Sequence, residues 1–170
     1  MKLNLGCGKD IKPDYVNLDI VDYGGNEIHD INKFPYPFED NTFEEIFASH
    51  VLEHVDNFNQ TITELYRIAK PNCELIVDAP FFLNTKYCGE PGHKIPFSIR
   101  TFDNYEFIGN RKLKFYEKWK LDHRTNYGSS AKFEVLEKRF ITSHFAALKW
   151  MDLIVNIEPV MYERFFAGIF

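Results

Sequence analysis

Two glycines and one aspartate near the start of the chain have the types and the spacing of a nucleoside-binding site. Gly6 and Gly8 directly follow a short β-type run, Lys2–Leu5, and glycine there allows the backbone to approach a ligand closely and to adopt a positive φ angle. Asp19 lies in a second predicted strand, Tyr15–Ile20, near the end where an open α/β sheet places its ligand crevice. A carboxylate at that place can accept hydrogen bonds from two adjacent ribose hydroxyls.

The same segment lacks the features that bind phosphate. In a dinucleotide site a third glycine opens a helix whose N-terminus holds the pyrophosphate, but Ile11 occupies that position here. Eleven positions (19 − 8) separate Gly8 from Asp19, where roughly 20 are usual, and Pro13 limits a helix between them to about one turn. The Walker pattern G-x-x-x-x-G-K-[ST] is absent from the sequence. We therefore predict a ligand that contains a ribose but no phosphate.

Around this segment, β-type runs alternate with loops and with one long helical pattern. Strands are predicted at residues 2–5, 15–20, 26–29, 43–49 and 73–79. The last of them, Cys73–Ala79, is apolar and β-branched, as is typical of a fully buried strand. A helix is predicted from about Val51 to Lys70, because apolar residues recur there at helical spacing and Pro71 follows. This order predicts an α/β fold with a Rossmann-like, mostly parallel sheet and flanking helices.

The second half of the chain is less regular. Residues 80–99 contain three prolines and form a predicted long loop, typical of a lid or a binding segment. Apolar residues alternate with lysines over residues 113–121, and Lys132–Ile141 is a second strand candidate, so we predict an antiparallel C-terminal hairpin with a solvated, lysine-rich edge. Helices are predicted at Phe145–Ile157 and Met161–Gly168. Because no linker or repeat interrupts the chain, we expect residues 1–170 to form a single domain.

The composition narrows the class of protein. The 170 residues are 45% hydrophobic and carry a formal net charge of −5, so we expect a packed core and do not expect a nucleic-acid partner. No apolar run approaches the ~18 residues that a membrane span needs. The cysteines, Cys7, Cys73 and Cys88, show no C-x-x-C spacing, which favours reduced thiols in a cytoplasmic protein.

An ordered series of motifs in the first half resembles the class I S-adenosylmethionine-dependent methyltransferase family, in particular its small type-11-like domain. The series consists of Leu3–Gly8, Val16–Asp19, His29–Ile31, Phe34–Ile46 and Ser49–His54, and the resemblance covers about residues 2–80. It implies an enzyme that uses S-adenosylmethionine and transfers its methyl group to a small-molecule acceptor, for example a sugar or a sugar nucleotide.

The resemblance also implies which residues contact the cofactor. Gly6 and Gly8 would pack against its amino-acid part, Asp19 would hold the ribose, and Asp30 would contact the adenine edge. Ser49 and His50 would line the methionine side near the sulfonium. The remaining residues expected in this site are neighbours of these motifs, namely Leu5, Cys7, Ile20 and Ile31.

The chain departs from the family pattern at three places. Asn4 stands where the family often has an acid, and Asp10 replaces a frequent third glycine. Family members usually finish with a strand, whereas this chain ends at Phe170 just after a predicted helix. We expect either that the C-terminal hairpin supplies the last strands or that the sheet is one strand short.

Two histidines are candidates for a catalytic base. His93, in the long loop, and His50 could each take a proton from an acceptor hydroxyl or acidic carbon. An alternative is a non-catalytic, cofactor-binding or regulatory module of the same fold. Titration with the cofactor and a turnover assay would distinguish the enzyme from the binding module.

A zinc hydrolase is a less favoured alternative, suggested by the pattern His50-x-x-Glu53-His54. That chemistry needs both histidines on one face of one helix, about a turn apart. Because His50 follows a predicted strand, we expect no metal and interpret Glu53 and His54 as structural residues at the start of a helix.

Overall fold

The computed structural model describes residues 1–83, 87, 89–105, 130–139, 153 and 156. The chain divides into two compact units, Met1–Pro96 with Gly128–Ala131 and Phe97–Tyr127 with Lys132–Phe170. The expectation of a single domain over residues 1–170 stays a prediction. Every predicted cofactor residue, His50 and His93 belong to the first unit.

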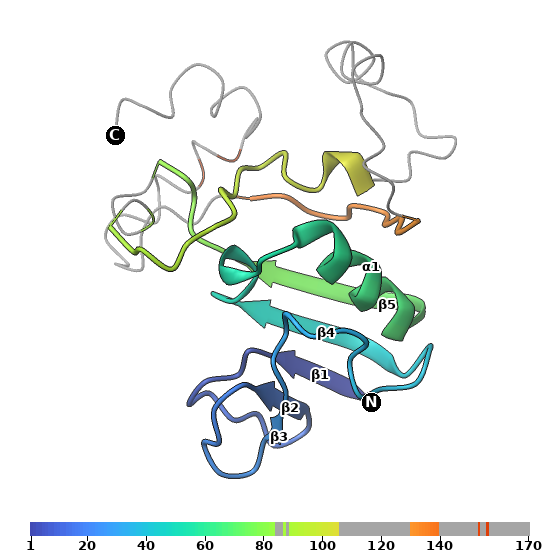
Figure 1. Ribbon diagram of the computed structural model, residues 1–170. Helices are drawn as coiled ribbons and strands as arrows, with labels where there is room; N and C mark the ends of the chain where they lie inside the picture. The colour runs from blue at the N-terminus through green and yellow to red at the C-terminus, as the bar shows by residue number, and fades with distance from the viewer. Residues whose placement is uncertain (84–86, 88, 106–129, 140–152, 154–155, 157–170) are drawn as a thin grey trace. The chain divides into compact units, whose positions relative to one another are not determined.

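The first unit contains a parallel sheet of five strands in the order β3-β2-β1-β4-β5. The strands are β1 (Lys2–Leu5), β2 (Val16–Asp19), β3 (Glu27–Ile28), β4 (Phe43–Ser49) and β5 (Ala69–Asp78). Their arrows point the same way in Figure 1, and Leu3 in the central strand pairs with Val16 on one side and Ile46 on the other. The expected mostly parallel sheet is confirmed, and all carboxyl ends of its strands lie along one edge.

One face of this sheet forms the core together with helix α1 (Phe58–Ile68). Leu3, Leu5 and Leu18 on the strands are fully buried, because alternate residues of a strand share a face. From α1 the residues at 3-to-4-residue spacing, Ile62, Leu65 and Ile68, are fully buried as well. Figure 1 shows α1 lying across the sheet.

The predicted long helix is wrong at its N-terminal end. Residues Leu52–His54 form a separate 3₁₀ turn, η1, Val55 is extended with ψ of 147°, and α1 begins only at Phe58. The side chain of Asn57 accepts a hydrogen bond of 3.1 Å from the amide of Gln60, so Asn57 caps the helix at that point. The separate turn matters for the site, because it places Glu53 and His54 beside the ends of the strands.

β5 begins directly after α1 and is less buried than its composition predicted. Its residues alternate between half-buried and exposed, and Ile76 is 36% exposed. β5 is an edge of the described sheet, which explains why one of its faces is open among these residues.

The described part of the second unit contains the 3₁₀ turn η2 (Asp103–Tyr105). The amide of Phe133 donates a hydrogen bond of 2.8 Å to the carbonyl of Tyr105. Apart from this contact, the described residues 132–139 show no strand pairing. The predicted strand Lys132–Ile141 is therefore not found over these eight positions. Residues 113–121 and the predicted helices at 145–157 and 161–168 fall outside the described residues, apart from Leu153 and Asn156. Among the described residues no helix is both long and apolar enough to cross a membrane.

Candidate functional site

The turn after β1 depends on glycine. Gly6 and Gly8 have φ angles of +60° and +50°, a region that costs a residue with a side chain roughly 1–2 kcal/mol. A Cβ atom on Gly6 would lie only 2.3 Å from Cγ2 of Val51, so the turn packs directly against the segment that follows β4. Cys7 between the glycines is 5% exposed, and its amide donates to the carbonyl of Leu18. Burial raises the pKa of the Cys7 thiol, which makes Cys7 a packing residue of the turn rather than a thiolate.

Asp19 is fixed against this turn. One carboxylate oxygen, Oδ2, accepts a hydrogen bond of 2.9 Å from the amide of Gly8, and Oδ1 accepts one of 3.0 Å from the amide of Val21. Each carboxylate oxygen has a second lone pair, so both can still accept a hydroxyl. The carboxylate is therefore held in one orientation at the end of β2 with acceptor capacity left over.

Asn4 holds the short connection between β1 and β2. Its amide donates to the carbonyl of Asp10 at 2.7 Å and to Oδ1 of Asn17 at 2.9 Å, and Asn17 Oδ1 also accepts from the amide of Lys12 at 2.9 Å. Asn4 is 2% exposed. Both donors of this side chain are thus used within the protein, where a carboxylate could not make the same bonds.

Three residues predicted to contact the cofactor lie beyond β2 and β3, namely Ile20, Asp30 and Ile31. Ile20 is 62% exposed directly after β2. Asp30 Oδ1 accepts from the amide of Asn32 at 3.0 Å, and the carbonyl of Ile31 accepts from the hydroxyl of Tyr36 at 2.9 Å. These bonds fix the segment that follows β3, while the side chain of Ile20 is left open to contact a planar ring.

Ser49 and His50 end β4 beside Asp78, the last residue of β5. The hydroxyl of Ser49 donates to Asp78 Oδ2 at 3.3 Å. His50 has a φ angle of +52°, and its Nε2 lies 3.8 Å from the same Asp78 oxygen while its Nδ1 lies 3.4 Å from Oε1 of Glu53. The imidazole of His50 therefore stands between two carboxylates, and 63% of its side chain is exposed.

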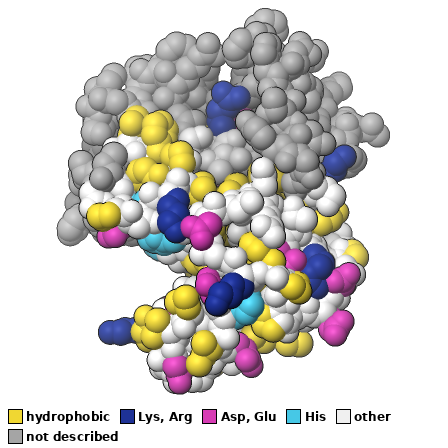
Figure 2. Space-filling model, in the orientation of Figure 1, with side chains coloured by type: hydrophobic (Ala, Val, Ile, Leu, Met, Phe, Trp, Pro, Cys, Tyr) yellow, Lys and Arg dark blue, Asp and Glu magenta, His cyan; other side chains and the backbone are white. Residues whose placement is uncertain are grey.

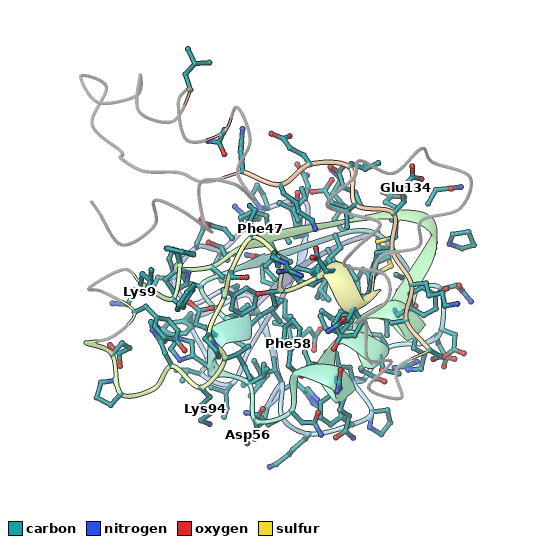
Figure 3. All side chains as sticks on the ribbon, turned by 90° about the horizontal axis from the view of Figure 1, so that it is seen from above. Lys9, Phe47, Asp56, Phe58, Lys94 and Glu134 are labelled. Atoms are coloured by element: carbon teal, nitrogen blue, oxygen red, sulfur yellow. The ribbon has the colours of Figure 1, made fainter. Side chains whose placement is uncertain are left out.

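His93 is brought to this end of the sheet by the loop that follows β5. The amides of Lys94 and Ile95 donate to the carbonyl of Glu53 at 2.7 and 3.0 Å. Lys94 Nζ lies 2.6 Å from Asp56 Oδ1, and Figure 3 shows these two side chains next to each other. The loop is thus docked on η1, and Nε2 of His93 lies 4.0 Å from Glu53 Oε1.

Two outcomes differ from the sequence interpretation of this region. His50 lies outside η1 whereas His54 is its last residue, so the two histidines do not share a helix face and the hydrolase arrangement is not formed. Glu53 is fully buried, whereas the sequence interpretation gave it only a structural role at the start of a helix. The signal was present as an acid between two histidines in the pattern His50-x-x-Glu53-His54.

The described surface is hollowed on the side where the strands end, as Figure 2 shows in the orientation of Figure 1. The glycine turn, Asp19, Ser49 and His50 all come from carboxyl ends of the strands of this sheet. In open α/β sheets ligands bind at this edge. The geometry fits an elongated ligand that has a diol near Asp19 and a charged or reactive group near His50.

Comparison with known proteins finds similarity to methyltransferases in part of the first unit. Residues 10–77 match the family described as a methyltransferase domain, and no curated protein matches the chain. An S-adenosylmethionine-dependent methyltransferase from Archaeoglobus fulgidus has the same fold, with a TM-score of 0.51 and 17% identity over 60% of this chain and 56% of that one. The expected Rossmann-like architecture is therefore confirmed.

Two further solved structures are similar at lower scores. A methyltransferase from Mesorhizobium loti has a TM-score of 0.41 and 15% identity over 47% of this chain and 46% of that one. The methyltransferase CalH, in complex with SAH, has a TM-score of 0.38 and 21% identity over 45% of this chain and 30% of that one. The chain thus aligns with between 30% and 56% of the length of these three proteins.

Proposed function

We propose that this chain binds S-adenosylmethionine at the carboxyl edge of its sheet and transfers the methyl group to a small-molecule acceptor. The match of residues 10–77 to a methyltransferase domain supports this proposal. The same match supports the resemblance seen in the sequence, and with it the proposed enzyme class and the proposed cofactor, S-adenosylmethionine. The acceptor, the assignment of individual residues and the activity of this particular chain are the proposal.

The single observation that carries the proposal is the Asp19 carboxylate held against the glycine turn. Oδ2 is bound to the amide of Gly8 and Oδ1 to that of Val21, so Asp19 is ordered before any ligand arrives and loses little side-chain freedom on binding. A ribose diol can take the remaining lone pairs. The connection from β1 to β2 contains no helix, so it offers no helix N-terminus to a phosphate.

The chemistry asked of the protein is modest, because the sulfonium of the cofactor already makes its methyl group electrophilic. The chain must align the acceptor atom with the methyl group and exclude water, which can supply about 7–11 kcal/mol in favourable cases. His50 and His93 are our candidates for a base where the acceptor is a hydroxyl. Both rings face the carboxylate of Glu53, which would stabilise the imidazolium formed when either accepts a proton.

For the acceptor we propose a small molecule such as a sugar or a sugar nucleotide, following the family resemblance, with no nucleic acid as partner because the chain is net acidic. We also propose a reducing, cytoplasmic location. Cys7 and Cys73 are both free thiols, which agrees with that environment.

The test of this function is Asp19→Ala. We expect the variant to bind S-adenosylhomocysteine at least about tenfold more weakly, since each lost charge-assisted hydrogen bond is worth about 1.5–3 kcal/mol. Calorimetric titration measures the affinity, and far-UV circular dichroism checks that the sheet is intact.

Asp22→Ala is the matched control. Asp22 lies three positions further along the chain and accepts a hydrogen bond of 2.8 Å from the amide of Gly24 on the exposed loop, so we expect its affinity to match the wild type. Equal affinity of Asp19→Ala and wild type would remove the ribose assignment. Tight binding by the wild type without turnover, across a panel of sugar acceptors, would favour the non-catalytic module instead.

A further inference from the structure

Glu53 is a buried carboxylate whose lack of hydrogen-bond donors the proposed methyl transfer leaves unexplained. Its side chain is fully buried, and neither Oε1 nor Oε2 has a hydrogen-bond donor among the described residues. Within that part of the chain no lysine or arginine forms an ion pair with it. The side chains that approach it with ring nitrogens are histidines, His50 at 3.4 Å and His93 at 4.0 Å. A buried carboxylate without donors is costly, unless a cation compensates its charge.

Two histidines around Glu53 have their ring orientation fixed by backbone carbonyls. Nδ1 of His54 lies 3.0 Å from the carbonyl of Gly92, and Nδ1 of His93 lies 3.2 Å from the carbonyl of Tyr87. Because a carbonyl oxygen only accepts hydrogen bonds, each Nδ1 must carry the proton. In the neutral ring the other nitrogen, Nε2, then holds a lone pair, and Nε2 of His93 is the atom that faces Glu53.

In this cluster the carboxylate oxygens of Glu53 and the Nε2 atoms of the neutral His54 and His93 rings all carry lone pairs, and none of these atoms carries a proton that it could donate. One ligand atom from each of Glu53, His54 and His93 lies within 4.8 Å of the other two. In metal centres the ligating histidines commonly donate their second ring nitrogen to a backbone carbonyl, which fixes the tautomer and orients the lone pair. Gly92 and Tyr87 have that role here.

We propose that Glu53, His54 and His93 form a binding site for a divalent transition-metal ion such as zinc. Two imidazole nitrogens and one carboxylate oxygen suit zinc, cobalt, manganese or ferrous iron, whereas calcium and magnesium prefer oxygen ligands alone. Ligand atoms that bind one zinc ion at about 2.0–2.2 Å must lie within about 4 Å of one another, so a contraction of the cluster on the order of 1 Å completes the site. Three protein ligands leave a coordination position for a further group, and an ion bound at Nε2 of His93 leaves His50 as the candidate base.

A bound ion would connect two segments of the chain, because its ligands come from different elements. Glu53 and His54 belong to η1 after β4, whereas His93 belongs to the loop that follows β5. A bound ion would connect these two segments, which lie 39 positions apart (93 − 54), at the carboxyl edge of the sheet. Its binding would add to the hydrogen bonds from Lys94 and Ile95 to the carbonyl of Glu53 in holding the loop in place.

The first experiment is a titration of the full chain with zinc alone, after treatment with a chelator and with no cofactor present. We expect one ion per chain. At a free zinc concentration near 100 times the dissociation constant, we expect the Tm to rise by about 5–10 °C. Replacing zinc with cobalt should give the visible absorption of a low-coordinate cobalt centre.

Variants separate a bound metal from a shared proton. In Glu53→Gln, which keeps the shape of the side chain, we expect zinc affinity to fall at least about 100-fold, beyond the ~10–100-fold typical of outer hydrogen-bond partners, and the zinc-dependent rise in Tm to disappear. His93→Gln, in the loop, provides the same readout if Glu53→Gln does not fold. His29→Gln is the matched control, since His29 lies in the segment after β3 and its Nε2 contacts the carbonyl of Lys33 at 2.9 Å, and it should bind zinc as the wild type does.

The metal site would be overturned if the wild type bound less than one equivalent of zinc. It would also be overturned if the zinc affinity were unchanged in Glu53→Gln and His93→Gln. Either result would leave an ion pair between Glu53 and a protonated histidine as the explanation of the cluster. The zinc titration contains no cofactor, and the Asp19→Ala titration contains no zinc. Failure of the metal site and failure of the proposed methyl transfer are therefore distinguishable.

Discussion

Replacing Gly6 by alanine is expected to lower the free energy of unfolding by about 2–5 kcal/mol. This total is the sum of about 1–2 kcal/mol for a side chain in the left-handed backbone region and about 1–3 kcal/mol for overpacking. The added Cβ would meet Val51 at 2.3 Å from Cγ2 and 2.7 Å from Cβ. Val51 is 7% exposed and packed, so it cannot move aside freely. Urea unfolding followed by circular dichroism measures the loss.

Gly8→Ala separates the two costs. Gly8 also has a positive φ angle, of +50°, but a Cβ there would meet no atom within 4 Å, so we expect only the backbone part, about 1–2 kcal/mol. In the double variant Gly6→Ala/Val51→Ala the 2.3 Å contact with Cγ2 is removed, although the 2.7 Å contact with Cβ remains, so the loss of unfolding free energy should be smaller than the sum of the two single losses. Equal losses for Gly6→Ala and Gly8→Ala would contradict the close approach of the turn to Val51.

The sheet was predictable because its signals are local. The strands 2–5, 15–20, 26–29 and 43–49 each showed as a short β-type run bounded by turn residues, and the observed strands fall within these ranges. The start of α1 was not predictable from periodicity, because residues 51–57 carry apolar side chains that also fit a helix. The cap at Asn57 and the extended Val55 decide the boundary, and only the packing of η1 at the sheet edge explains them.

The two parts of the candidate site also differ in how far their contacts could be predicted from the sequence. Gly6, Gly8 and Asp19 are joined by one short connection between adjacent parallel strands, so the sequence predicted that they would meet. Glu53 and His93 are 40 positions apart (93 − 53), and they meet because the amides of Lys94 and Ile95 bind the carbonyl of Glu53. Hydrogen bonds between a loop backbone and a distant carbonyl leave no pattern in side-chain types, so the cluster could be recognised only in the folded chain.

A second buried carboxylate, Glu64 on α1, is paired with the half-buried Arg67, which holds the turn-rich segment of residues 34–40 against the helix. Its guanidinium donates to Glu64 Oε1 at 2.6 Å and Oε2 at 3.0 Å, to the carbonyl of Phe38 at 2.8 Å and to Asp40 at 2.7 Å. Glu64 also accepts from the amide of Tyr36 at 2.6 Å and is 8% exposed. Burial by itself would raise the pKa of Glu64, but the hydrogen bonds from Arg67 and the Tyr36 amide outweigh burial, so its pKa is lowered from 4.5.

Arg67→Ala is therefore expected to destabilise the chain by about 2–4 kcal/mol at neutral pH, somewhat less than the ~3–5 kcal/mol for a fully buried pair, because 28% of the Arg67 side chain is exposed. Adding Glu64→Gln removes the unpaired carboxylate and should recover part of the loss. Arg139→Ala is the matched control, since Arg139 and Glu137 are 64% and 71% exposed and 3.7 Å apart, and it should change the free energy of unfolding by less than about 1 kcal/mol.

The stability difference between the wild type and Arg67→Ala should depend on pH, in a direction set by the pKa of Glu64. Because the folded pKa of Glu64 is lowered, the unfolded chain binds a proton at Glu64 at a higher pH than the folded chain does, and the stability supplied by the pair is lost as pH falls below 4.5 through the folded pKa. In Arg67→Ala the buried carboxyl loses its partner, so its protonation at low pH removes an unfavourable charge. The difference between wild type and Arg67→Ala, measured by urea unfolding from pH 7 to pH 3, should therefore shrink with falling pH. A difference that stays constant over this range would mean that Arg67 stabilises the segment through its bonds to the carbonyls of Phe38, at 2.8 Å, and Tyr36, at 3.3 Å, rather than through the charge of Glu64.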